Sequence, residues 1–194
     1  MRIFAWGDSE EALNIPRWGE YDYKNSTFDA SFLLGHVKPG EDHGKAIVNF
    51  PGWSLARLAQ WRCPPSPSTP IVDWAAQAVI RKFADEGQIT FYPLDAVCKD
   101  GVSGEFSFIA PRLRLRCIDF AKSDLTMGLV DSGHPYVSWW KQMSFLDDCL
   151  GSAHIAWEHH LAGVVVVSEP LRDALMSLGG KGLAIVRPED YKCY

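Results

Sequence analysis

The sequence has no apolar stretch long enough to cross a membrane and no export signal at its start. Its longest apolar run, residues 161–167, has seven residues, whereas a membrane-spanning helix needs about 20. The first residues turn acidic at Asp8, before the apolar core of a signal peptide could form. We therefore expect a cytoplasmic protein with no membrane partner.

A large excess of charge of one sign is also missing. The 19 Lys and Arg residues against 24 Asp and Glu residues give a net charge of −5, which argues against a nucleic-acid partner and suits a basic protein partner. With 47% hydrophobic and 22% charged residues, the composition excludes a disordered or low-complexity chain. These values predict a folded globule of one domain, or of two small lobes.

Cysteine is sparse, and its spacing indicates no disulfide framework. The five cysteines form no CxxC pair and stand at positions 63, 98, 117, 149 and 193. An odd and scattered set is typical of thiols in a reducing cytosol. We therefore predict reduced cysteines.

Motifs that would carry catalysis or bind a cofactor are absent. His154 and His159 are five residues apart, which on a helix would separate them by roughly 140°, and the HExxH spacing of zinc proteases does not occur. Residues 101–104 lack the GxSxG register of a nucleophile elbow, and the glycines of 179–182 follow a predicted helix instead of preceding one. We predict no catalytic, metal-binding or cofactor-binding residue. A Cys149 dyad with either histidine stays open, because such partners meet only in the folded chain.

A proline-rich connector at residues 63–70 cannot continue a helix or a ladder. It predicts a boundary between a Trp-rich part of strands and loops, residues 1–63, and an α+β part, residues 71–194, packed as one globule. In the first part, short apolar segments between turn formers predict strands at 3–6, 32–34 and 46–48.

Two strand–helix–strand units are predicted in the second part. Asp73 is a predicted N-cap, Gly87 a predicted helix stop, and a strand follows at 89–92. A shift of 95 residues reproduces the pattern, with Ser168 as N-cap and a strand at 183–186. The apolar positions at helical spacing are Ala76, Val79, Ile80 and Phe83 in the first unit, and Leu171, Ala174, Leu175 and Leu178 in the second. Repetition and convergence both explain this pattern.

The region between the units is predicted to be mainly antiparallel sheet. An Asp-Gly turn at residues 99–101 predicts a hairpin of strands 91–97 and 102–109. Arg112, Arg114 and Arg116 alternate with apolar residues, which we interpret as the solvated face of a strand. Residues 126–153 show little periodicity and read as a loop or a short helix. The predicted fold class is therefore α+β, with mostly short antiparallel strands and two amphipathic helices.

Eight tryptophans are more than a core of this size normally needs. Because aromatic side chains are enriched in binding hot spots, some of them are expected at the surface. The candidate partner-binding residues are Tyr136, Trp139, Trp140, Asp147 and Asp148. Packing of these rings between the two lobes is the alternative.

Four successive blocks resemble the immunity protein 11 family of bacterial polymorphic toxin systems. They are residues 88–94, 106–109, 117–123 and 165–175, within a resemblance that covers roughly residues 70–190. The blocks are strand and helix signatures and include no catalytic set. Residues 155–157 depart from the family, since they lack the arginine of its Phe-Arg pair.

The resemblance implies a bacterial protein that binds a cognate toxin and inhibits it by occlusion, without catalysis and without a cofactor. The oligomeric state is left open. The alternatives are a small-ligand-binding protein, an enzyme with a Cys/His site, and a structural subunit that oligomerises through its aromatic surface.

Overall fold

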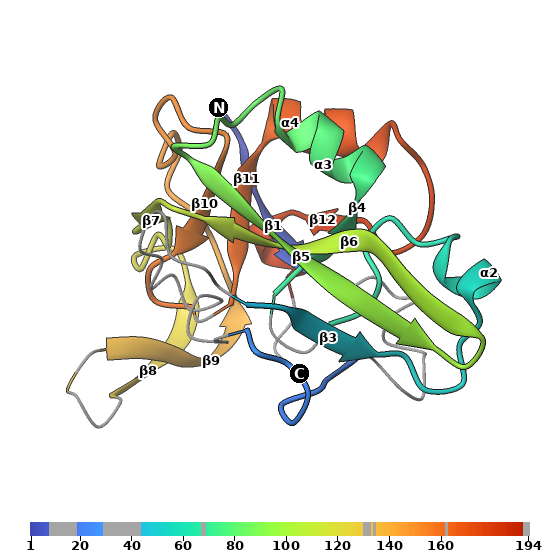
Figure 1. Cartoon of the computed structure of the whole chain (residues 1–194). Coiled ribbons are helices and arrows are strands. Elements are labelled where there is room, and N and C mark those ends of the chain that lie inside the picture. Colours follow the sequence, from blue (N-terminus) through green and yellow to red (C-terminus); the bar gives the residue numbers. More distant parts are fainter. Residues whose placement is uncertain are drawn as a thin grey trace.

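Strands dominate the fold, and short helices flank them. The computed structural model describes residues 1–7, 19–28, 44–66, 69–129, 133, 135–161 and 163–191. Within these residues, the strands form two five-stranded sheets and one two-stranded hairpin (Figure 1). The predicted α+β class is confirmed. The strand predicted at 32–34 lies outside the described residues.

The first sheet is antiparallel except at one edge. Its order is β12 (Ala184–Val186), β1 (Ile3–Gly7), β11 (Val165–Ser168), β10 (Ile155–Glu158) and β7 (Arg114–Leu115). All residues of β10 and β11 are buried, because both faces of the sheet are covered. The arginine-bearing strand shrinks to the two residues of β7, which pair in parallel with β10.

The second sheet contains the predicted hairpin. Its order is β2 (Glu20–Tyr21), β3 (Ala46–Asn49), β5 (Ile89–Cys98), β6 (Gly101–Pro111) and β4 (Ile71–Asp73). The Asp-Gly turn joins β5 to β6 as predicted, and Gly101 has a φ of 153° that favours glycine. The strand predicted to meet Pro93 continues through it, and Pro93 pairs with Ser107.

Both predicted helices form behind their predicted N-caps. The Asp73 carboxylate accepts a hydrogen bond from the N–H of Ala76 at the start of α3 (Trp74–Ile80). The Ser168 hydroxyl does the same for Leu171 at the start of α4 (Glu169–Met176). The first helix ends well before Gly87, at the C-cap Arg81. A further short helix, α2 (Leu55–Leu58), and a 3-10 turn, η2 (Pro188–Asp190), were not predicted.

The two strand–helix–strand units share one topology. In the unit β4–α3–β5, both strands lie antiparallel to β6 between them, and in the unit β11–α4–β12 both lie antiparallel to β1. The two strands of each unit therefore run parallel, as in a split βαβ motif. The helices α3 and α4 lie side by side (Figure 1). Topology thus agrees with the sequence shift.

Three apolar clusters hold these layers together. One lies between the first sheet and the two long helices and contains Trp6 and Trp157; a second lies beneath β5 and β6 and contains Trp53 and Trp61. The third covers the opposite face of the first sheet. Strands β1 and β3, from the part before residue 63, pair with strands of the later part. The boundary at 63–70 stays a prediction.

The expected loop or short helix at 126–153 is wrong. This segment contributes to a β-hairpin of β8 (Asp124–Leu129) and β9 (Pro135–Gln142), which projects from the molecule at the lower left of Figure 1. Two irregularities in the ladder leave Ser138 and Lys141 as extra residues in β9. Such bulges, together with the exposure of both strands, erase the period of two that marks a strand in a sequence. No helix among the described residues is long and apolar enough to span a membrane.

Candidate partner-binding site

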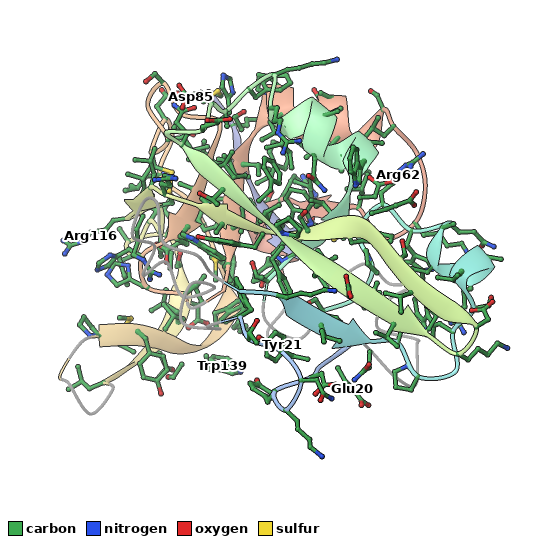
Figure 2. The ribbon with its side chains drawn as sticks, in the orientation of Figure 1. Glu20, Tyr21, Arg62, Asp85, Arg116 and Trp139 are labelled. Carbon is green, nitrogen blue, oxygen red and sulfur yellow. A yellow bond between two sulfur atoms is a disulfide. The ribbon has the colours of Figure 1, made fainter. Side chains whose placement is uncertain are left out.

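The exposed face of the β8–β9 hairpin carries two of the five predicted site residues. Tyr136 is 39% exposed and Trp139 is 49% exposed. Their partners on β8 are Gly128 and Thr126, and a Cβ on Gly128 would lie within 2.7 Å of the Tyr136 ring. The glycine therefore lets the tyrosine ring lie flat on the hairpin. The side chain of Trp139 lies beside β9 at the periphery of the molecule (Figure 2).

Trp140 takes part in packing instead. Its ring stacks on Tyr191 with an interplanar angle of 5° and a centroid distance of 5.6 Å. Its indole Nε1–H donates to the Tyr191 carbonyl at 2.8 Å. Trp140 lies at the margin of the third apolar cluster, which includes the buried Val137. These contacts attach the hairpin to the body of the protein.

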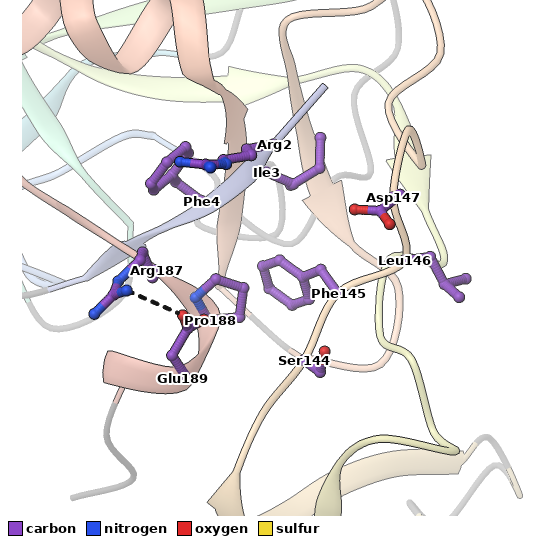
Figure 3. A pocket seen from close by; sticks show the side chains of 10 residues that line it. All are labelled: Arg2, Ile3, Phe4, Ser144, Phe145, Leu146, Asp147, Arg187, Pro188 and Glu189. Carbon is purple, nitrogen blue, oxygen red and sulfur yellow. Dashed lines mark ion pairs between the residues drawn. The ribbon is translucent and has the colours of Figure 1, made fainter.

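Asp147 and Asp148 lie at the start of β1 and not on the hairpin. Asp147 lines a pocket of about 360 Å³ together with Arg2, Phe145 and Arg187 (Figure 3). Asp148 accepts a hydrogen bond from the N-terminal ammonium group of Met1, and this contact raises the pKa of that group. The structure therefore brings together Tyr136 and Trp139, and places the two aspartates elsewhere.

A disulfide closes the base of the segment that carries the hairpin. Cys117 and Cys149 are joined, with their Cα atoms 5.3 Å apart, so the prediction of reduced thiols is wrong for this pair. The pairing could not be predicted because the two cysteines are far apart in the sequence, and only the hairpin between them brings them together. Cys63 and Cys98 are free and buried. In the disulfide-bonded state Cys149 has no free thiol to act as the nucleophile of a Cys/His dyad.

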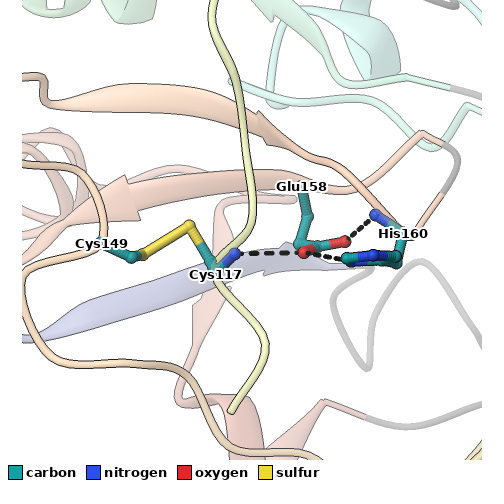
Figure 4. Close-up of a disulfide and its surroundings, with 4 residues drawn as sticks. All are labelled: Cys117, Cys149, Glu158 and His160. Atoms are coloured by element: carbon teal, nitrogen blue, oxygen red, sulfur yellow. Dashed lines mark hydrogen bonds and ion pairs between the residues drawn. A yellow bond between two sulfur atoms is a disulfide. The ribbon is translucent and has the colours of Figure 1, made fainter. Parts of the chain in front are cut away.

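A buried carboxylate organises the same base. Glu158 is fully buried on β10, and it accepts backbone N–H bonds from Cys117 and His160 (Figure 4). It accepts a third from Leu161. The His160 Nδ1 atom lies 3.6 Å from the carboxylate. Backbone donors thus compensate the desolvation of the charge. No sequence pattern marks Glu158 as an organising residue, because its donors come from distant backbone.

The remaining candidate groups are separate. His154 shares a hydrogen bond of 2.7 Å with Ser168, whereas His159 lies beside Arg116. Burial, followed by the charges of His160 and Arg116, lowers the pKa of His159. Arg112, Arg114 and Arg116 are exposed, as predicted for a wet face, and Figure 2 shows Arg116 pointing outward. The part of the chain that the structure describes contains no group of three His, Cys, Asp or Glu side chains suited to a metal.

Comparison with known proteins identifies the family. The profile of the Immunity protein family (Imm11) matches residues 70–190. The chain belongs to this family. The match includes α3, the β5–β6 and β8–β9 hairpins and the unit built around α4, and confirms the resemblance stated from the sequence. A comparison with curated proteins gave no match.

Proposed function

We propose that this Imm11 protein binds a cognate toxin of a bacterial polymorphic toxin system and inhibits it by occlusion, without catalysis. Family membership supports the immunity role. The observation that carries the site is the exposed pair Tyr136 and Trp139 on a hairpin whose base is closed by a disulfide. A surface held in place before binding loses little conformational entropy when the partner docks.

The chemistry of this face suits a protein partner. Exposed Tyr and Trp side chains supply large contact areas and dominate many binding hot spots. The net charge of −5 favours a basic toxin domain through long-range attraction. Trp140 supports the hairpin through its contacts with Tyr191. Asp147 and Asp148 lie apart from this face, among the cationic groups of Arg2, Arg187 and the Met1 ammonium group.

We propose that the protein is cytoplasmic, and the immunity role of its family is the only support for this compartment. The disulfide between Cys117 and Cys149 means that the cysteines give no support for this compartment. The redox state of this pair in cells, read by thiol alkylation and mass spectrometry, tests the compartment. Alkylation of both cysteines is expected in a reducing cytosol, where the Ile118–Phe145 bridge and the stacking of Trp140 on Tyr191 would hold the base of the hairpin without the bond.

The test compares two exposed tryptophans. Trp139→Ala should weaken binding to the toxin domain encoded directly upstream by about 30-fold, the effect of losing one aromatic hot spot. Trp74→Ala is the matched control, since Trp74 is 70% exposed on α3, away from the hairpin. Calorimetric titration measures the affinity, and survival of cells that express the toxin measures protection. Equal affinities for wild type and Trp139→Ala would reject this face.

A further inference from the structure

The outer edge of β8 carries backbone groups that have no backbone partner among the described residues. The Val137 N–H on β9 donates to the His160 carbonyl, away from β8. Its cross-strand partner Met127 therefore occupies a non-hydrogen-bonded position, and its own N–H and C=O point away from β9. The N–H and C=O groups of Leu125 and Leu129 also point away from β9, because the direction of these groups alternates between successive residues of a strand. Among the described residues, no backbone hydrogen bond outside the hairpin engages these three positions.

The sequence of β8 itself, and its described surroundings, give this edge little of the usual protection against pairing. Proteins protect open edges with lysine, proline or bulges, and β8 contains neither lysine nor proline. Both bulges of the hairpin lie in β9, so β8 itself stays regular. Met127 is 39% exposed and Leu129 is 70% exposed. The edge can thus offer main-chain hydrogen bonds and apolar contacts together.

We propose that β8 receives an extended strand of the partner toxin by β-augmentation, which deepens and rests on the proposed function. The added strand is apolar opposite residues 125–129 and carries a basic side chain near Asp124. Main-chain pairing then provides affinity, while side chains on alternate faces provide specificity. On one face the added strand continues the surface of Tyr136 and Trp139, which lies across β8 from the open edge.

Charge favours the toxin over a second copy of the chain. Asp124 is the single charged residue of β8, and it attracts a lysine or arginine of the incoming strand. Two copies of this chain each carry a net charge of −5 and repel one another at low ionic strength. A basic toxin domain meets no such repulsion.

A proline placed on the outer edge tests the proposal. Met127→Pro removes an outward N–H and leaves the bonds between β8 and β9 in place, so it should weaken binding to the upstream-encoded toxin domain about tenfold or more. Met127→Ala is the matched control and should change the affinity by less than about threefold, because it keeps the N–H. Wild-type affinity of a folded Met127→Pro variant would overturn strand addition. Loss of binding in Trp139→Ala alone would then leave the proposed function standing.

Hydrogen exchange gives a reading that does not depend on a variant. In the free protein the amides of Met127 and Leu129 should exchange rapidly, and in the complex with the toxin domain they should become protected. The amides of Thr126 and Gly128 face β9 and should be protected in both states. Unchanged exchange at Met127 and Leu129 would overturn the proposal, as would a dimer of the free chain that Met127→Pro converts to monomers.

Discussion

At the scale of single residues, Glu158 depends most on its surroundings, because its carboxylate is buried and needs hydrogen-bond donors from the protein. A fully buried carboxylate has no water to solvate it, and three backbone N–H groups take the place of water. Those donors belong to Cys117 and to the turn after β10, so one side chain joins two segments far apart in the sequence. Removal of the side chain leaves the three N–H donors without an acceptor and also leaves a cavity.

Glu158→Ala should therefore lower the free energy of unfolding by about 3 kcal/mol. Glu105→Ala, at an exposed position of β6, should change it by less than about 0.5 kcal/mol. Urea unfolding monitored by tryptophan fluorescence measures both. A Glu158→Ala variant as stable as wild type would show that the buried carboxylate is not the organiser of this turn.

His159 links stability to pH. Burial and the neighbouring charges of His160 and Arg116 lower its pKa below the ordinary value of 6.5, with the Glu158 carboxylate acting in the opposite direction. As the pH falls, the His159 imidazole of the unfolded chain is therefore protonated at a higher pH than that of the folded chain. The contribution of His159 to stability is complete above about pH 6.5 and is lost as the pH falls through the lower, folded pKa.

The pKa can be read directly by NMR titration of the imidazole. Arg116→Gln should raise the pKa of His159, because it removes a neighbouring cation. His159→Gln should flatten the fall in stability between pH 7 and pH 5. If Arg116→Gln leaves the titration of His159 unmoved, the guanidinium does not act on the ring.

At the scale of elements, the hairpin and its disulfide act together. The bond between Cys117 and Cys149 closes a loop with a sequence separation of 32 residues, and this loop contains all of β8 and β9. A short ladder reinforces the closure, since Ile118 bridges Phe145 and Leu146 donates to the carbonyl of Cys117. The proposed binding face is thus held at its base by a covalent bond.

A Cys117→Ser, Cys149→Ser double variant should lose about 3 to 4 kcal/mol of stability, the loop-closure entropy of a ring of this size. Cys98→Ser is the control, because Cys98 is a buried free thiol far along β5. Thermal melts with and without reductant measure the effect. A wild-type melt that reductant leaves unchanged, with reduction verified by mass, would show that the loop is held by packing alone.

The helices could be predicted from sequence and the hairpin could not. Asp73 and Ser168 predict helix starts because an N-cap side chain accepts a hydrogen bond from the residue three positions later, within the same stretch of chain. β8 and β9 pair across bulges and bury little, so their apolar residues follow no period. Tyr136 and Trp139 were predicted from their residue type, whereas Asp147 was grouped with them only because it is near in the sequence.

At the scale of the whole molecule, pairings between distant strands define the fold. β1 lies between β11 and β12, and β3 lies beside β5. No local sequence pattern specifies such neighbours. A boundary near residues 63–70 could therefore be inferred from the prolines, but the pairing of strands from the first part with strands of the second part could not be inferred. Glu158 and the disulfide escaped prediction for the same reason.

The position of β1 has a consequence for protein synthesis. Ile3 pairs with Ser168, and Ala5 pairs with Val186, so the first strand leaves the ribosome long before either neighbour exists. Until then Phe4 and Trp6, both buried in the finished protein, stay uncovered on a strand with two bare edges. Pairing over such distances is slow, and domains assemble only as their parts are synthesised. Under the proposed function, inhibition of a toxin would therefore begin only after β11 and β12 have been synthesised and have paired with β1.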